Sequence, residues 1–190
     1  MKTKRKELKI PLTNIEKINF MSSLSTGLIP IHEERTITSL YFDTVDFMLY
    51  KNSKYFDVNR YKIRYRKYSN SDKIFKEIKF TNNDSKYKEV YESKYSFLNE
   101  IKKFTYKENL LVPTLYVSYT RNYFLYKDSR LTLDTNISFC SHKFRTLSTI
   151  SYSPENLNIL EFKLLNNTED IEKYIRKSPQ KFSKYDFGIE

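Results

Sequence analysis

Residues 60–68 read Arg-Tyr-Lys-Ile-Arg-Tyr-Arg-Lys-Tyr, and this stretch decides the fold class. Side chains alternate across a β-strand, so residues two apart share a face. One face of the stretch therefore carries four cations, and the other carries aromatic and aliphatic side chains. The four cations are Arg60, Lys62, Arg64 and Arg66. The pattern predicts a strand with one charged face and one apolar face.

The same alternation recurs on both sides of this stretch and predicts about eight strands. They are Lys4–Pro11, Arg35–Asp43, Asp57–Tyr68, Lys73–Thr81, Lys86–Glu92, Leu115–Lys127, Arg130–Phe139 and Asn158–Leu165. Polar clusters at Ser69–Asp72 and Asn82–Ser85 predict hairpin turns between neighbouring strands.

Helical spacing of apolar residues predicts three short helices. The first covers Asn14–Leu24, with Thr13 as its capping residue. Its expected apolar face contains Ile15, Ile18 and Met21 or Ser22, the second helix contains Phe97, Ile101 and Phe104, and the third contains Ile171, Tyr174 and Ile175. Many strands with few helices predict an α+β, mainly β fold: a roughly eight-stranded antiparallel β-barrel with peripheral helices. We expect a single domain over residues 1–190.

The composition predicts a polyanionic partner. The 190 residues carry a net charge of +11, together with 17 Tyr and 14 Phe. Aromatic residues suit half-buried sheets, and an excess of cations attracts nucleic acid, anionic membrane surfaces or phosphorylated small molecules. The composition leaves these three open.

Several classes of site and location are excluded or disfavoured by the residues that are scarce. The chain has 2 Gly, which excludes Walker and dinucleotide-binding loops, so side chains must hold any phosphate. Cys140 is the single cysteine, which excludes an internal disulfide and a cysteine-based metal site. No long apolar run or secretory signal occurs, and we therefore expect a soluble cytoplasmic protein.

The charged strand faces permit two interpretations. Charged outer faces are common in antiparallel sheets, so a solvated face is the simplest explanation of any one strand. Six strands, however, carry Arg, Lys or Glu at adjacent same-face positions, with little of the Thr, Ser, Asn and Gln that outer faces usually contain. A barrel with these faces turned inward and its apolar faces covered by helices explains the set better. Burying so many like charges is costly unless a polyanionic ligand neutralises them.

Eight sequence blocks, in order along the chain, carry a family resemblance. They are RKELK (5–9), SLYFDT (39–44), KIRYRKY (62–68), FKEIK (75–79), VSYTR (117–121), RLTLDT (130–135), ILEFK (159–163) and KFSKY (181–185). With these blocks the chain resembles the VTC domain of polyphosphate polymerases, within the triphosphate tunnel metalloenzyme (CYTH-like) superfamily. The resemblance covers nearly the whole chain.

The resemblance implies three groups of site residues. The implied catalytic cations are Arg64, Arg66, Lys79, Arg121, Arg130 and Lys9. The implied substrate-binding residues are Arg60, Lys62, Lys86, Lys88, Lys163, Lys181, Ser183 and Lys184. A divalent metal, Mn²⁺ or Mg²⁺, is implied at Glu161, with Glu7 and Glu77 as further metal ligands or lysine partners.

The implied activity is transfer of the ATP γ-phosphate to a growing inorganic polyphosphate chain. One alternative is an inorganic or RNA 5′-triphosphatase of the same fold; the low acid count at Arg5–Lys9 and Glu161–Lys163 favours polyphosphate over this reading. The second alternative is a polyanion-binding module without catalysis, in which cations and aromatic residues bind strands by charge and stacking. The glutamates that interrupt the basic faces argue against it. Nucleic acid is expected as a partner only for the RNA triphosphatase.

Overall fold

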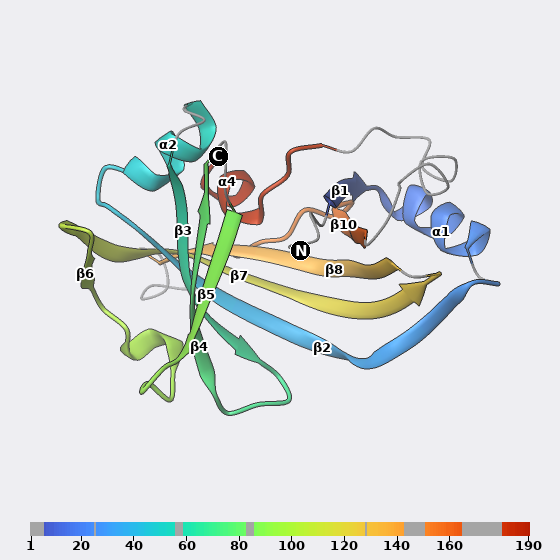
Figure 1. Ribbon diagram of the computed structural model, residues 1–190, viewed down its shortest axis with the longest axis horizontal. Coiled ribbons are helices and arrows are strands. Elements are labelled where there is room, and N and C mark those ends of the chain that lie inside the picture. Colours follow the sequence, from blue (N-terminus) through green and yellow to red (C-terminus); the bar gives the residue numbers. More distant parts are fainter. Residues whose placement is uncertain are drawn as a thin grey trace, which may run out of the picture. The chain divides into compact units, whose positions relative to one another are not determined.

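Antiparallel strands dominate the computed structural model, which describes residues 6–24, 26–55, 59–82, 86–127, 129–142, 151–164 and 180–190 (Figure 1). The strands are β1 (Lys6–Leu12), β2 (Leu28–Asp43), β3 (Arg60–Tyr68), β4 (Ile74–Thr81), β5 (Lys86–Glu92), β6 (Phe104–Tyr106), β7 (Asn109–Tyr126), β8 (Ser129–Ser141), β9 (Ser151–Tyr152) and β10 (Asn158–Leu164). The helices are α1 (Asn14–Ser23), α2 (Met48–Tyr55), the 3₁₀ turn η1 (Leu98–Glu100) and α4 (Lys184–Ile189). The predicted mainly β, antiparallel architecture is confirmed.

The strands are hydrogen-bonded in the order β1-β10-β8-β7-β2-β3-β4-β5, with β6 on β7 and β9 on β8. In the described part of the chain this path is open, because no ladder joins β1 to β5. The chain divides into two compact units. The first unit comprises Met1–Arg35, Tyr119–Ile137 and Ser153–Phe182, and the second comprises Thr36–Ser118, Ser138–Tyr152 and Ser183–Glu190. The single domain over residues 1–190 stays a prediction.

The eight predicted strands are all present, most of them with shifted ends. β5 has the predicted bounds, whereas β2 begins at Leu28, seven residues before the predicted Arg35, and passes through Pro30. The predicted turn at Ser69–Asp72 joins β3 to β4, where the Ser71 amide donates to the Tyr68 carbonyl. Two short strands, β6 and β9, and the helices α2 and α4 were not predicted, since each is too short to show a period.

Helix α1 is confirmed, but only part of its expected apolar face, Met21, packs in the core. Thr13 and Glu16 form a reciprocal capping box at its start. Ile15 is 72% exposed and Ile18 is also exposed, whereas Phe20 is buried in the core of the first unit. Phe20 and Leu24, the residue that follows the helix, complete this contact with the core. A count of helical spacing did not place them there.

The second predicted helix is wrong. Only the single turn η1 forms between Phe97 and Ile101, and Phe104 begins β6 instead. Phe104 lies opposite Leu111 in the ladder of β6 with β7. The backbone hydrogen bonds of this ladder stabilise a strand at Phe104, although the spacing of the three apolar residues is helical. The third predicted helix, around Ile171–Ile175, lies outside the described residues.

Helices cover the apolar strand faces in both units, as predicted. In the first unit, Ile10, Leu160 and Phe162 pack with Phe20. In the second unit the apolar faces of β2, β3 and β4 pack with α2 and η1; the buried residues are Leu40, Phe42, Leu49, Ile63, Tyr65, Ile74, Ile78, Leu98 and Ile101. The charged strand residues therefore lie on the opposite face within each unit.

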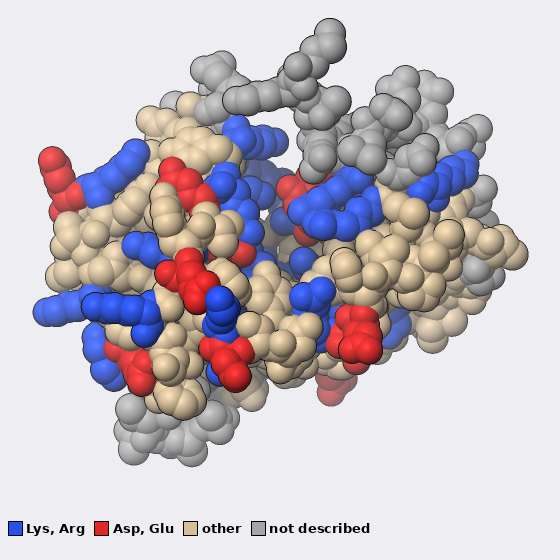
Figure 2. Space-filling model, turned by 60° about the horizontal axis from the view of Figure 1, so that its bottom comes forward, with Lys and Arg blue, Asp and Glu red and all other residues tan. Residues whose placement is uncertain are grey.

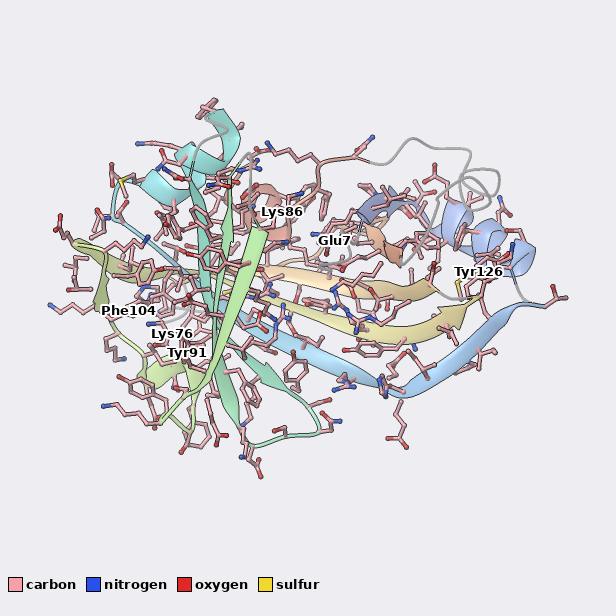
Figure 3. The ribbon with its side chains drawn as sticks, in the orientation of Figure 1. Glu7, Lys76, Lys86, Tyr91, Phe104 and Tyr126 are labelled. Atoms are coloured by element: carbon pink, nitrogen blue, oxygen red, sulfur yellow. The ribbon has the colours of Figure 1, made fainter. Side chains whose placement is uncertain are left out.

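Lys76 is an exception on the apolar face of β4. Its ammonium lies 4.2 Å from the centroid of the Phe104 ring and 5.9 Å from that of Tyr65 (Figure 3). Burial lowers the pKa of Lys76, and the aromatic rings stabilise its charge by cation–π contact.

None of the helices in the described ranges is long and apolar enough to cross a membrane.

Candidate phosphate and metal site

The cations of the second unit are aligned by the register of β3, β4 and β5. Lys62 lies opposite Lys79, which lies opposite Lys88 on β5. Arg64 lies between Tyr41 of β2 and Glu77 of β4. Directly opposed residues in antiparallel strands share a face, so the ladder gathers these side chains on one surface. We call it the cationic face of the second unit: Tyr41, Lys62, Arg64, Arg66, Glu77, Lys79 and Lys88.

Arg64 is held in one orientation by its two neighbours. Its Nε donates to Glu77 Oε2 at 2.7 Å, its Nη2 lies 2.6 Å from the same oxygen, and its Nη1 donates to the Tyr41 hydroxyl at 2.7 Å. The arginine charges and the hydrogen bond oppose the effect of full burial and lower the pKa of Tyr41. A planar guanidinium fixed in this way is suited to binding phosphate oxygens without further ordering.

Glu77 is the buried counter-ion of the cationic face. It is 3% exposed, its Oε2 lies 3.5 Å from Arg66 Nη1, and its Oε1 accepts from Lys88 at 2.6 Å. Burial opposes ionisation, but Arg64, Arg66 and Lys88 lower the pKa of Glu77 to about 2. Both carboxylate oxygens are occupied by cations of its own unit. The geometry favours the lysine-partner alternative for Glu77 over the metal-ligand alternative.

Lys62 connects β3 to the C-terminal motif. Its ammonium lies 2.7 Å from the Ser183 hydroxyl and 2.8 Å from Asp186 Oδ2. Ser183 also caps helix α4 by accepting from the Asp186 amide. Burial lowers the pKa of Lys62, and Asp186 partly opposes this shift.

Asp43 and Tyr185 hold α4 in the second unit, and sequence reasoning did not pair them. Asp43 is fully buried; it accepts from the amides of Leu49 and Tyr50 at the start of α2, and from the Tyr185 hydroxyl at 2.6 Å. Tyr185 also stacks on Tyr41, with ring centroids 4.9 Å apart. Asp43 and Tyr185 are 142 residues apart, so the spacing within either sequence block could not reveal this contact.

The remaining predicted residues of this unit differ in exposure. Arg66 is 5% exposed and donates to Ser39, whereas Lys79 and Lys88 are exposed. Lys86 begins β5 and is also exposed (Figure 3). The ladder places Lys86 and Arg60 on either side of Thr81, and Lys184 lies in the first turn of α4. The space-filling view shows Lys and Arg gathered with acidic residues among them (Figure 2).

The first unit carries a carboxylate pair surrounded by cations. Glu161 of β10 is 7% exposed and lies opposite Lys9 of β1. Its carboxyl is hydrogen-bonded to Glu7, and Lys163 Nζ lies 3.4 Å from its Oε1. Burial opposes ionisation, but the bond to Glu7 and the charges of Lys9, Arg121 and Lys163 lower the pKa of Glu161.

Arg121 is fixed by Asp134, a buried acid that was not among the predicted site residues. Its Nε and Nη2 bind the two oxygens of Asp134 at 2.5 and 2.7 Å. Asp134 is fully buried, and sequence alternation places it on the same strand face as Arg130 and Thr132. Arg130 lies opposite Lys163 and is exposed, as is Lys181.

The residues of the first unit fit a divalent cation that also binds phosphate. Among the residues that the structure describes, no group of three His, Cys, Asp or Glu could hold a metal. Glu7 and Glu161 nevertheless form a close pair. Mg²⁺ is usually bound by one or two carboxylates together with substrate phosphates and waters, so a pair suffices.

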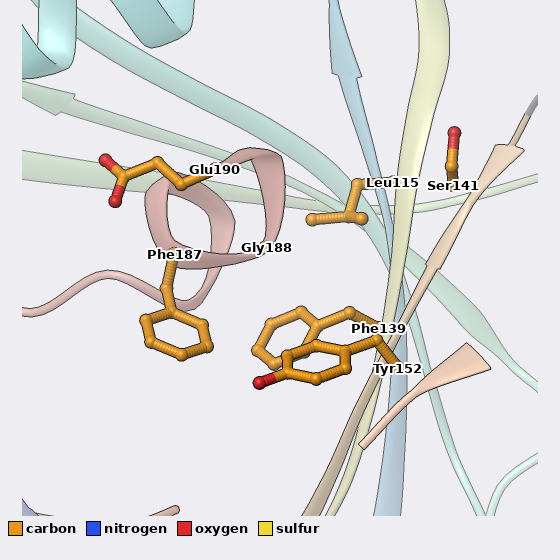
Figure 4. Close-up of a pocket in the computed structure, with 7 residues that line it drawn as sticks. All are labelled: Leu115, Phe139, Ser141, Tyr152, Phe187, Gly188 and Glu190. Carbon is orange, nitrogen blue, oxygen red and sulfur yellow. The ribbon is translucent and has the colours of Figure 1, made fainter. Parts of the chain in front are cut away.

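A separate pocket lies beside α4 and contains none of the predicted site residues (Figure 4). It is lined by Leu115, Phe139, Ser141, Tyr152, Phe187, Gly188 and Glu190. Its lining is mainly apolar and aromatic, which does not suit a phosphate chain. The candidate site therefore consists of the charged faces and not this pocket.

Ordered arginines and a carboxylate pair lie on the charged strand faces of a mainly β protein. The family follows from the sequence: the model of the VTC domain matches residues 3–103 and 82–190. The chain belongs to the VTC domain family, which confirms the resemblance. No curated protein matches the sequence.

Solved structures support the fold alone. The PH1819 protein from Pyrococcus horikoshii OT3 is similar with a TM-score of 0.55 and 14% identity, over 96% of this chain and 97% of that one. HpAC1 from Hippeastrum is similar with a TM-score of 0.54 and 15% identity, over 95% of this chain and 93% of that one. HpAC1 is described as an adenylyl cyclase candidate with a dominant triphosphatase activity. The likeness to these two structures shows that the chain shares their fold.

Proposed function

We propose that this protein is a metal-dependent polyphosphate polymerase that transfers the ATP γ-phosphate to a growing inorganic polyphosphate chain. The observation that carries the proposal is the match of the VTC domain model from residue 3 to residue 190. The ordered cations of both units support it, since phosphoryl transfer depends on positioning and charge neutralisation more than on covalent chemistry by the protein.

The second unit is proposed to bind and orient phosphate. Arg64 presents a guanidinium that Glu77 and Tyr41 hold in place, and Arg66 is held by Glu77 and Ser39. Exposed lysines such as Lys79 add charge that can follow a phosphate chain as it moves. Groups fixed before the substrate binds lose little entropy when the transition state forms.

The first unit is proposed to hold the metal. Glu161 is the principal ligand and Glu7 the second, because they form the close carboxylate pair of this unit. A bound Mn²⁺ or Mg²⁺ would neutralise phosphate oxygens and fix the reacting phosphorus. Lys9, Lys163 and Arg121 keep Glu161 ionised and offer charge to the phosphate chain, and Asp134 fixes the direction of Arg121.

A triphosphatase is the second candidate function. The fold neighbour HpAC1 is described as having a dominant triphosphatase activity, and the two reactions differ only in the acceptor, water or phosphate. The same binding and metal residues serve both. A non-catalytic polyanion-binding module is the third candidate and explains the net charge of +11 but not the buried carboxylates Glu77 and Glu161.

Product analysis separates the three candidates. Purified protein is incubated with ATP and Mn²⁺ or Mg²⁺, and the phosphate products are resolved by length. We expect long-chain polyphosphate together with ADP. Release of orthophosphate, with no chain longer than the substrate, would refute the polymerase and favour the triphosphatase. ATP that stays unchanged under all conditions would refute both enzymes and favour the polyanion-binding module.

Variants assign the activity to the two charged clusters. Glu161→Gln and Arg64→Ala are each expected to reduce turnover at least about 100-fold, because each removes a group that acts on transition-state charge. Lys73→Ala is the control, since it removes one exposed cation that pairs with Glu92 outside both clusters. Turnover of Glu161→Gln equal to that of the wild type would refute the metal assignment.

A further inference from the structure

A buried hydroxyl of the first unit has no hydrogen-bond partner. Thr132 of β8 is 2% exposed, and its Oγ1 makes no hydrogen bond within the described part of the chain. Buried hydroxyls almost always find a partner, because leaving one unsatisfied gives up its hydrogen bonds to water. The two polar residues that flank it on its strand face are Arg130 and Asp134, and Asp134 is committed to Arg121.

The register places this hydroxyl beside the proposed metal ligand. Thr132 and Glu161 are directly opposite each other in the ladder of β8 and β10. Directly opposed side chains in an antiparallel pair have Cβ atoms about 4.5–5.5 Å apart, which is within reach of a Thr-to-Glu hydrogen bond. Glu161 instead bonds to Glu7 in this structure.

Glu161 has two carboxylate oxygens, and a metal ion bound to one of them leaves the other able to accept a hydrogen bond. The Thr132 hydroxyl is a buried donor directly opposite Glu161 and has no other partner in the described part of the chain. Metal-binding carboxylates are generally held in this way by a neighbouring donor.

We propose that Thr132 is a positioning residue whose hydroxyl donates a hydrogen bond to Glu161 when Glu161 holds a divalent metal ion. This inference rests on the proposed function, because it assumes the metal at Glu161. Lys9, Lys163 and Arg121 also bear on Glu161, but each is a cation and repels a dication at close range. The neutral hydroxyl orients the carboxylate without adding positive charge.

Mn²⁺ binding to three proteins tests this role. The wild type, Thr132→Val and Thr132→Ser are titrated with Mn²⁺ without nucleotide, and free Mn²⁺ is followed by electron paramagnetic resonance. Thr132→Val is expected to weaken Mn²⁺ binding at least about 10-fold, as loss of an outer-shell partner does. Thr132→Ser keeps the hydroxyl and is expected to remain within about 3-fold of the wild type.

Urea unfolding of the metal-free proteins distinguishes positioning from a structural role. Thr132→Val is expected to unfold at the same urea concentration as the wild type or a higher one, because it removes a hydroxyl that has no partner. If Thr132→Val binds Mn²⁺ as tightly as the wild type, the inference is overturned. It is also overturned if Thr132→Val unfolds at a lower urea concentration than the wild type and Thr132→Ser binds Mn²⁺ as weakly as Thr132→Val.

The reference variant Glu161→Gln separates failure of the inference from failure of the proposed function. If Glu161→Gln binds Mn²⁺ like the wild type, the metal is not at Glu161 and both are wrong. If Mn²⁺ binding depends on Glu161 and Thr132 but ATP yields no phosphate transfer, the inference stands and the proposed activity fails.

Discussion

At the scale of single residues, the two buried glutamates differ in what surrounds them. Glu77 accepts from Arg64 and Lys88 and lies near Arg66, so both of its oxygens are used by cations. Glu161 lies beside a second carboxyl group, that of Glu7, and such a pair suits a divalent metal ion. The sequence context of both is similar, because each is followed by an apolar residue and precedes a lysine by two positions. Their partners on neighbouring strands give them different chemistry.

The pH dependence of stability is expected to report the Glu77 network. The folded-state pKa of about 2 lies below the ordinary value of 4.5, so this contribution is present above about pH 4.5 and is lost as the pH falls toward 2. Glu77→Gln is expected to cost about 3 kcal/mol at pH 7, because it leaves Arg66 and Arg64 without their counter-ion.

Urea unfolding of the wild type and Glu77→Gln at pH 7, 5, 4 and 3 measures this difference. The gap between the two proteins is expected to narrow below pH 4.5. Between pH 4.5 and 2 the unfolded wild type takes up a proton at Glu77 that the folded protein does not, which favours unfolding of the wild type. A gap of the same size at pH 7 and pH 3 would show that the ion pairs contribute nothing to stability.

At the scale of elements, helix α4 depends on close packing within the second unit. It is only six residues long and too short to be stable by itself. Two hydrogen bonds hold it in place, from the Tyr185 hydroxyl to Asp43 and from the Lys62 ammonium to Ser183. A Cβ atom at Gly188 would lie 2.4 Å from Phe139 Cδ1 and 2.7 Å from Leu115 Cδ2. The absence of a side chain at Gly188 therefore lets α4 approach the strands.

Gly188→Ala is expected to loosen α4 and destabilise the protein by about 1–3 kcal/mol, the usual cost of overpacking a tight contact. Ser183 caps α4 and binds Lys62, so a displaced α4 is also expected to disturb Lys62 and to lower the rate of phosphate transfer. Thermal unfolding checks the first effect and ATP turnover the second. Asn99→Ala, at an exposed position of η1, is the control, and Gly188→Ala behaving like this control would contradict the close packing.

At the scale of the whole molecule, the net charge of +11 is expected to make phosphate-chain binding strongly dependent on salt. Inorganic tripolyphosphate is expected to bind at least about 10-fold more weakly in 0.5 M than in 0.05 M NaCl, because salt screens exposed charges. Calorimetric titration at several salt concentrations measures the slope. Arg64→Ala is expected to have a shallower slope than Lys73→Ala, and a wild-type affinity independent of salt would contradict an electrostatic site.

The sequence alone determined the class of the fold. Alternation of charged and apolar residues identified the eight strands that build the main path of the sheet, since a strand buried on one face must alternate with a period of two. The eight ordered blocks also gave the family, which the VTC domain match confirms. Alternation could not find β6 and β9, which contain three and two residues, or decide which face of α1 is buried.

Only the tertiary structure decided which polar and charged residues are partners. Arg121 and Asp134, Lys62 and Asp186, and Asp43 and Tyr185 are between 13 and 142 residues apart, and no local period relates them. Registry between strands also placed Thr132 opposite Glu161, where an ordinary threonine becomes a candidate positioning residue. A one-dimensional pattern records which face a side chain is on, whereas hydrogen bonds and ion pairs depend on which strand lies next to it.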